Sequence, residues 1–177
     1  MSYEEKSMEN IFIEENGAYS IDCRTAVWAT DKMHEDYHNA GIHINDVDFL
    51  IKNATHILMV EYKNACIENA ENPNAFHPME EKKISIATRK FYDSLHYLRL
   101  LEKDKPIQYI YILEYPNGDA TTRKRLRDRL KTELPFVLQN NIGKGKKLIE
   151  RVEVLSIAEW NADSNYREYP IKRVTLQ

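Results

Sequence analysis

The chain has 177 residues, a formal net charge of −3, and 42 % hydrophobic and 30 % charged residues, which fits one globular domain and excludes a fibrous or low-complexity protein. Its two cysteines lack metal-binding spacing and are too few for a disulfide framework. No apolar run approaches the ~20 residues needed to cross a bilayer, and the acidic start carries no signal-peptide pattern. We therefore expect a cytoplasmic protein without a membrane segment.

The predicted elements follow from the spacing of apolar residues and the turn residues around them. The first elements are a hairpin over 11–22 that turns at Gly17, a helix over 25–39 ended by Gly41, and a hairpin of 48–51 and 57–63 that is buried on both faces. A loop over 69–81, an amphipathic helix over 82–101 and a strand over 107–113 follow. The last elements are a helix that is capped by Asp119 and carries leucines at 126, 130, 134 and 138, and a strand over 151–157.

Helices separate the later strands, which indicates a single α/β domain over 11–158 with a central mixed β-sheet flanked by helices. We expect a flexible N-terminus over 1–10 before this domain. A polar, loosely packed C-terminal tail is expected over 159–177, from about Trp160 onward.

The second hairpin brings charged side chains to the edge of an apolar core. If its turn is centred between residues 54 and 55, Asp48 lies opposite Glu61, with Cβ atoms ~5 Å apart. Strand alternation places Lys63 on the same face, and the carbonyl of Tyr62 offers another oxygen. Two carboxylates at this distance favour a bound cation, and Mg²⁺ prefers such hard oxygens together with water. A metal there would polarise a phosphate and activate a water that Lys63 orients.

The two strands of this hairpin carry a recognisable motif, Asp46-Val-Asp48-Phe-Leu-Ile followed by Val60-Glu61-Tyr62-Lys63-Asn64. It resembles the Asp…Glu-x-Lys motif of the PD-(D/E)xK family, the restriction-endonuclease-like nucleases. The resemblance extends from the first helix to the strand over 107–113. It implies a restriction-endonuclease-like core, metal-ligand roles for Asp48 and Glu61, and a catalytic role for Lys63.

The same resemblance implies further positions around the motif. Glu35 on the preceding helix would be an additional acidic residue of the site. Either Lys83 or Lys90, on the helix after the motif, would be an accessory basic residue, and the sequence does not decide between them. A short first core strand would lie over 42–44.

The expected activity is therefore a Mg²⁺- or Mn²⁺-dependent nuclease that hydrolyses phosphodiester bonds of nucleic acid, with DNA favoured over RNA as the substrate and the choice between them left open by the sequence. Two alternatives stay open. One is a non-catalytic nucleic-acid-binding or accessory module on the same fold. The other is a zinc metallopeptidase, because His34-Glu35-Asp36-Tyr37-His38 matches HExxH, although Ile44 stands where the extended motif has its third histidine. A homodimer is compatible with this size, since small nucleases often use two copies to cut both strands.

Charge is distributed unevenly along the chain. Residues 1–50 carry eleven Asp and Glu against three Lys and Arg, whereas residues 121–151 carry ten Lys and Arg against three Asp and Glu. The basic segment could contact phosphates, or it could be the solvated face of a leucine-striped helix. The residues that we expect to bind nucleic acid are Arg123, Lys124, Arg127, Lys131, Lys144 and Lys146.

Overall fold

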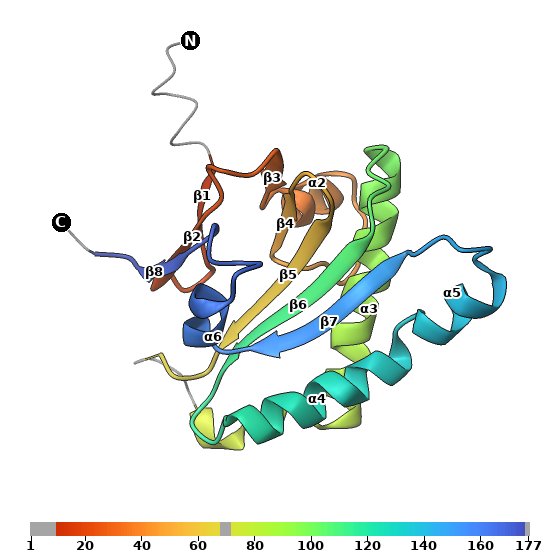
Figure 1. Cartoon of the computed structure of the whole chain (residues 1–177). Helices are drawn as coiled ribbons and strands as arrows, with labels where there is room; N and C mark the ends of the chain where they lie inside the picture. The colour runs from red at the N-terminus through yellow and green to blue at the C-terminus, as the bar shows by residue number, and fades with distance from the viewer. Residues whose placement is uncertain (1–9, 68–71, 176–177) are drawn as a thin grey trace, which may run out of the picture.

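The structure is a computed structural model that describes residues 10–67 and 72–175. Its centre is a five-stranded sheet (Figure 1) in the order β3-β4-β5-β6-β7. The strands are β3 (Trp28–Thr30), β4 (Phe49–Lys52), β5 (Ile57–Asn64), β6 (Ile107–Glu114) and β7 (Ile149–Leu155). Strands β3, β4 and β5 are antiparallel neighbours, whereas β5, β6 and β7 are parallel. The central sheet is thus mixed, as predicted.

Two helices cover one face of this sheet, α3 (Glu81–Leu100) and α4 (Ala120–Glu133). Helix α3 buries Ile84, Ala87 and Phe91 against the sheet, which confirms the predicted amphipathic pattern. Helix α4 packs on α3 and on β7, and the Asp119 side chain caps it by accepting from the Thr122 N–H at 2.6 Å. The connection from β5 through α3 to β6 is therefore a crossover between parallel strands.

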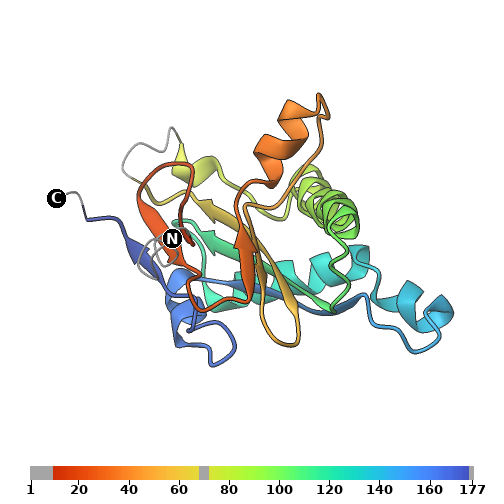
Figure 2. The same ribbon diagram turned by 90° about the horizontal axis from the view of Figure 1, so that it is seen from above.

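The other face is covered by a small sheet and a short helix (Figure 2). These elements are β1 (Ile11–Ile13), β2 (Tyr19–Asp22), α6 (Ile157–Ala162) and β8 (Ile171–Arg173). The first hairpin is present as predicted, and Gly17 in its turn has φ of 71°, a conformation that glycine adopts without strain. Each face of the central sheet thus has its own apolar cluster.

The helix predicted over 25–39 is shorter than expected. Its first part is the edge strand β3, in which Trp28 pairs with Lys52 of β4, and only α2 (Met33–Asn39) is helical. Hydrogen bonds to the neighbouring strand outweigh the weak local preference for a helix. Gly41, with φ of 72°, ends α2 as predicted. Because β3 occupies the edge beside β4, the strand expected over 42–44 is absent, and those described residues are irregular.

The expected loose C-terminal tail is a packed part of the fold, so that prediction is wrong. Trp160 is fully buried, stacks on Tyr166 at 4.8 Å between ring centroids, and donates from Nε1 to the Tyr169 carbonyl. Strand β8 then pairs with β2, which means that β7 is not the last strand. The sequence does contain a signal for this packing, since the large aromatic rings of Trp160, Tyr166 and Tyr169 stand among polar residues and rings of that size are usually buried.

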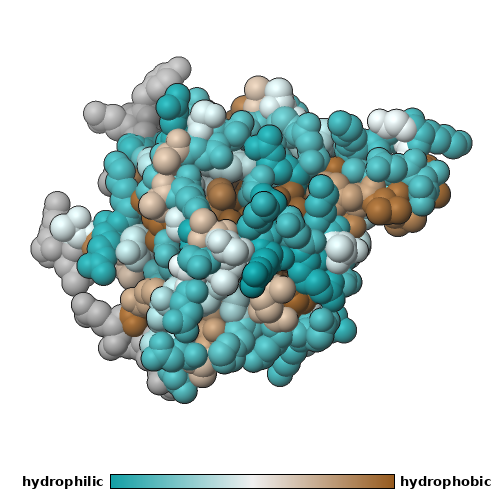
Figure 3. All heavy atoms as spheres, turned by 60° about the horizontal axis from the view of Figure 1, so that its bottom comes forward, coloured by the Kyte–Doolittle hydropathy of each residue, from teal (hydrophilic) through white to brown (hydrophobic). Residues whose placement is uncertain are grey.

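The predicted leucine stripe is also interrupted. Leu126, Leu130 and Leu134 are buried, but Pro135 has no N–H to continue the helix. A separate helix, α5 (Phe136–Ile142), follows, and Leu138 on it is 55 % exposed. Figure 3 shows α5 projecting from the body of the molecule with apolar side chains at its surface.

Some predictions fall where the structure makes no statement. Residues 1–9 of the expected N-terminus, residues 69–71 of the expected loop and residues 176–177 lie outside the described residues. The rest of that loop contains a short 3-10 helix, η1 (Pro73–Ala75). Among the described residues, no helix is both long enough and apolar enough to span a bilayer.

Candidate functional site

The central hairpin opens at the point where the motif residues lie. Its register pairs Phe49 with Val60, and continuing that register sets Asp48 opposite Glu61 and Val47 opposite Tyr62. The backbone bonds expected for the last pair are replaced. The Val47 N–H donates to Ser94 Oγ at 3.0 Å, and the Tyr62 N–H donates to Asp48 Oδ2 at 2.7 Å. The two strands separate here, and side chains take the place of the ladder.

This opening also orients a backbone oxygen. The N–H and C=O of one strand residue point to the same side, so the Tyr62 carbonyl faces the β4 edge together with its N–H. The Val47 N–H, which would be its partner in a continued ladder, is held by Ser94 on α3. The carboxylates of Asp48 and Glu61 therefore lie on the face of the hairpin that α3 covers, and the Tyr62 carbonyl is directed to the gap between β4 and the end of β5.

Glu61 is held by a lysine from α3. Lys90 Nζ donates to both carboxylate oxygens of Glu61, each at 2.8 Å. The side chain of Glu61 is only 9 % exposed and that of Lys90 is 22 % exposed. Of the two lysines left open by the sequence, Lys90 is therefore the one at the motif, whereas Lys83 lies over the ring of Phe76, at 5.6 Å from its centroid.

Burial and charge crowding control the protonation of the pair. Removal from water raises the pKa of Glu61 well above its usual value, and the neighbouring charge of Asp48 raises it further, against the effect of Lys90. Burial likewise raises the pKa of Asp48, although Lys90 and the Tyr62 N–H oppose this. Burial by itself would lower the pKa of Lys90, but the charges of Glu61 and Asp48 raise it. The lysine is therefore the charge that permits two carboxyl groups in this place.

Two tyrosines of β6 complete the buried side of the cluster. Tyr111 lies beside Glu61 in the β5–β6 register, and Tyr109 donates from its hydroxyl to the Ala87 carbonyl at 2.7 Å. Burial raises the pKa of both phenols, and the charge of Glu61 raises each further, so both stay protonated at neutral pH. The sequence does not reveal either tyrosine as part of the site, because their position depends on the register between β5 and β6.

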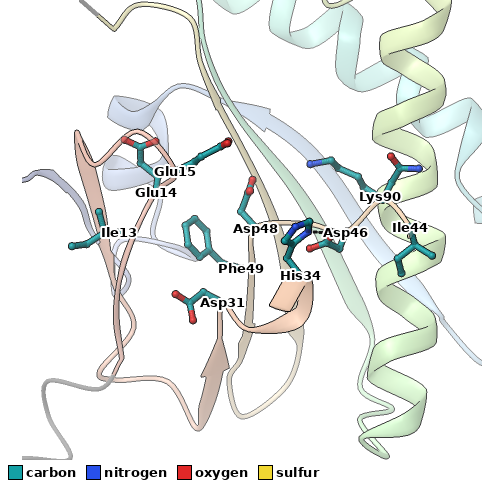
Figure 4. Close-up of a pocket in the computed structure, with 11 residues that line it drawn as sticks. Ile13, Glu14, Glu15, Asp31, His34, Ile44, Asp46, Asp48, Phe49 and Lys90 are labelled. Carbon is teal, nitrogen blue, oxygen red and sulfur yellow. Dashed lines mark hydrogen bonds and ion pairs between the residues drawn. The ribbon is translucent and has the colours of Figure 1, made fainter. Parts of the chain in front are cut away.

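A cleft of about 470 Å³ opens on the site (Figure 4). Asp48 and Lys90 approach it from the hairpin and from α3, while His34 of α2 lies beside Asp46 with its Nδ1 at 3.1 Å from Oδ1. The acidic residues that line the cleft are Glu14, Glu15, Asp31, Asp46 and Asp48. Only Asp48 of these was proposed from the sequence. The other four come from three separate segments of the chain, at 14–15, 31 and 46, so local patterns do not bring them together.

The remaining motif residues are less closely engaged. Lys63 is on the same face of β5 as Glu61 by strand alternation, and it is exposed to solvent. Glu35 is also exposed and pairs with Lys32 at 3.3 Å, and the cleft is lined by His34 from that helix rather than by Glu35. Glu35 therefore makes no described contact with the site residues that would support the role proposed for it.

The predicted nucleic-acid-binding residues lie elsewhere. Helix α4 packs on β7, the edge of the sheet opposite β3 (Figure 1). Several of its basic groups already have partners: Arg123 bonds to Glu159 at 2.9 and 3.0 Å, Arg127 bonds to Asp128 at 2.9 Å, and Lys131 lies over the Phe136 ring. The more exposed positions are Lys124, Lys144 and Lys146. The structure does not bring this segment to the acidic cleft.

The HExxH string does not assemble a zinc site. His34 pairs with Asp46, and His38 lies edge-on to His43 with ring centroids 6.5 Å apart. Within residues 10–67 and 72–175, no group of three or more His, Cys, Asp or Glu side chains is arranged to hold a metal ion. The ligands expected from the sequence, Asp48, Glu61 and the Tyr62 carbonyl, would be a different kind of donor set, two carboxylates and a carbonyl. Mg²⁺ is a cation that binds proteins through one or two carboxylates and keeps several waters.

Comparisons of the chain with protein-family models, with curated proteins and with solved structures gave no match.

Proposed function

We propose that this chain is a Mg²⁺- or Mn²⁺-dependent nuclease with a restriction-endonuclease-like core, and that it hydrolyses phosphodiester bonds of DNA. The observation that carries the proposal is the opening of the β4–β5 ladder. It sets Asp48 and Glu61 side by side and turns the Tyr62 carbonyl toward the same gap. Carboxylates are buried in such proximity only where a cation or a proton compensates them.

The order of elements supports the same proposal. Helix α2, the antiparallel strands β4 and β5, the crossover helix α3 and the parallel strand β6 follow one another along the chain. This is the helix–strands–helix–strand order that the resemblance to the PD-(D/E)xK family implies, although the third antiparallel strand, β3, precedes α2 instead of following it at 42–44. The motif residues therefore lie on or next to the strands β4 and β5. Rigid elements of this kind are needed to hold a reacting phosphate in a fixed position.

The chemistry divides among a few groups. A divalent cation supplies polarisation of the phosphate and a more acidic bound water. Asp48, Glu61 and the Tyr62 carbonyl would hold that cation. Lys63, exposed on the same face of β5, would orient the water or neutralise the phosphate. Tyr111, beside Glu61 and protonated, offers a hydroxyl donor to the same region.

One observation favours the second candidate, a non-catalytic nucleic-acid-binding or accessory module. The cleft is also lined by Glu14, Glu15 and Asp31, whose negative charge repels a phosphate backbone unless cations accompany it. The basic segment lies at the other edge of the sheet. A module of this kind would bind nucleic acid through Lys124, Lys144 and Lys146 and leave it uncut.

The test is a cleavage assay on supercoiled plasmid, single-stranded DNA and RNA with Mg²⁺, Mn²⁺ or EDTA. Wild type should cut DNA only with metal, and Asp48→Asn and Lys63→Ala should each lose at least about a hundredfold in rate. His38→Ala, which changes α2 without touching the cleft, should retain activity. The absence of metal-dependent cleavage by wild type would support the binding module, and loss of activity in His38→Ala would contradict the assignment of the site. Linear rather than nicked plasmid would indicate that two copies act together.

A further inference from the structure

We propose that Lys90 is a built-in competitor for divalent cations: its ammonium occupies Glu61 until a cation binds, and Asp46 then receives it. The inference concerns the carboxylates of the proposed metal site and so rests on the proposed function. Its test is cation binding, which can be measured whether or not nucleic acid is cut.

The occupied position is visible in the structure. Both carboxylate oxygens of Glu61 accept from Lys90 Nζ at 2.8 Å, and the pair is largely removed from water. A cation that uses Glu61 must therefore replace this contact. The exchange is feasible because an ammonium is a point charge on a flexible four-carbon chain, so it can turn without moving the helix.

The receiving position is held at a short distance by the fold. The Asn45 N–H donates to Asp93 Oδ2 at 2.8 Å, and the Val47 N–H donates to Ser94 Oγ at 3.0 Å, so the segment carrying Asp46 is bonded to α3 on both sides of that residue. Asp93 and Ser94 follow Lys90 by three and four residues and share its helix face.

Asp46 also has room and charge for the ammonium. It lines the same cleft as Lys90, its side chain is 10 % exposed, and its negative charge acts on Lys90 as well as on Asp48. One of its oxygens is paired with His34. Lys90 and Asp46 both line the cleft (Figure 4), so an ammonium turned toward Asp46 would stay in the cleft, where an anionic group of a substrate would meet it.

The experiment is titration of the metal-free full chain with Mn²⁺ by calorimetry, together with the shift in Tm at saturating Mn²⁺. Lys90→Met removes the competitor, so Mn²⁺ should bind at least about tenfold more tightly than to wild type. Lys90→Arg should weaken binding severalfold, because a guanidinium holds a carboxylate through two parallel bonds. Lys83→Met, which removes the same charge from the same helix, should change affinity less than about twofold.

Two results would overturn the proposal. One is unchanged or weaker Mn²⁺ binding by Lys90→Met, and the other is binding by Lys90→Arg that equals wild type. If Lys90→Met does not fold without metal, the arginine variant decides the matter, because it keeps the charge and the buried stem.

Asp46→Asn tests the receiving position. It should weaken Mn²⁺ binding severalfold in wild type and have little effect in the Lys90→Met background, where no ammonium needs a new partner. An equal loss in both backgrounds would show that Asp46 acts on the cation directly and would refute the exchange. Tighter Mn²⁺ binding by Lys90→Met without any DNA cleavage would uphold this inference and reject the nuclease. DNA cleavage by wild type, together with no effect of Lys90→Met on Mn²⁺ binding, would uphold the nuclease and reject this inference.

Discussion

Charged residues form two very different groups in this molecule. In the cleft site, Asp48, Glu61 and Lys90 are packed between the hairpin and α3, and each changes the protonation of the others. On α4, at the other edge of the sheet, Arg127 and Asp128 pair in solvent, with 33 % and 57 % of their side chains exposed. Exposed pairs of this kind contribute little to stability, whereas a buried pair is costly to break.

A high density of charged residues in the sequence is therefore a poor guide to where a functional site lies. The basic segment is conspicuous in the sequence, yet much of it is neutralised by neighbours on the same surface. The cleft site contains few charges, but they are largely removed from the water that would screen them. Four measurements can test this contrast between the two groups of charges.

Lys90→Met should destabilise the metal-free protein by about 3 kcal/mol, because it leaves a buried carboxyl pair without its cation. Urea unfolding in EDTA measures this. Adding Glu61→Gln should restore a large part of the loss, since the uncompensated charge is then gone. Lys83→Met is the matched control on the same helix. A loss in Lys90→Met no larger than in that control would remove the distinction between the two groups.

The stability difference between Glu61→Gln and wild type should depend on pH. The pKa of Glu61 is raised in the folded state by burial, so the folded protein binds this proton more tightly than the unfolded chain does. Wild type therefore loses stability as pH rises above the ordinary value of 4.5, and the glutamine variant escapes this loss. In urea unfolding from about pH 4 to 8 in EDTA, the free energy of unfolding of the variant should therefore increase relative to that of wild type as pH rises. Parallel curves would contradict the raised pKa.

Arg123→Ala should lower the free energy of unfolding by about 1 kcal/mol, an intermediate effect, because this arginine holds a carboxylate through two charged hydrogen bonds. It makes two bonds to Glu159, and its side chain is only 11 % exposed. Glu159 in turn accepts from the Ser156 N–H at the start of α6. Thermal unfolding of Arg123→Ala, Glu159→Ala and the double variant measures the coupling. Additive losses would mean that the two residues do not stabilise each other.

Replacing Lys124, Lys144 and Lys146 together by alanine should change stability by less than about 0.5 kcal/mol, since all three are exposed. If the basic segment contacts phosphates, the same variant should bind DNA more weakly and with a smaller dependence on salt. Fluorescence anisotropy at several salt concentrations measures both. Unchanged affinity at low salt would assign these lysines to an ordinary solvated surface.

Local patterns in the sequence are enough to predict the features that depend on neighbours in the chain. Strand alternation and a polar turn were enough to predict the central hairpin and to set Asp48 opposite Glu61. Helical spacing located α3, and the Asp119 cap located the start of α4. In each of these cases the contacts that define the element lie within a few residues or across one short turn, so periodicity and capping chemistry carry the information.

Features that depend on distant segments follow from the tertiary fold and not from local patterns. It selected Lys90 rather than Lys83, because the position of α3 against β5 determines which lysine reaches Glu61. It made an edge strand of Trp28–Thr30 by pairing that segment with β4. It buried Trp160 under contacts from the end of the chain. These outcomes are set by packing and by hydrogen bonds between segments far apart in sequence, and local patterns do not encode which partner a residue will meet.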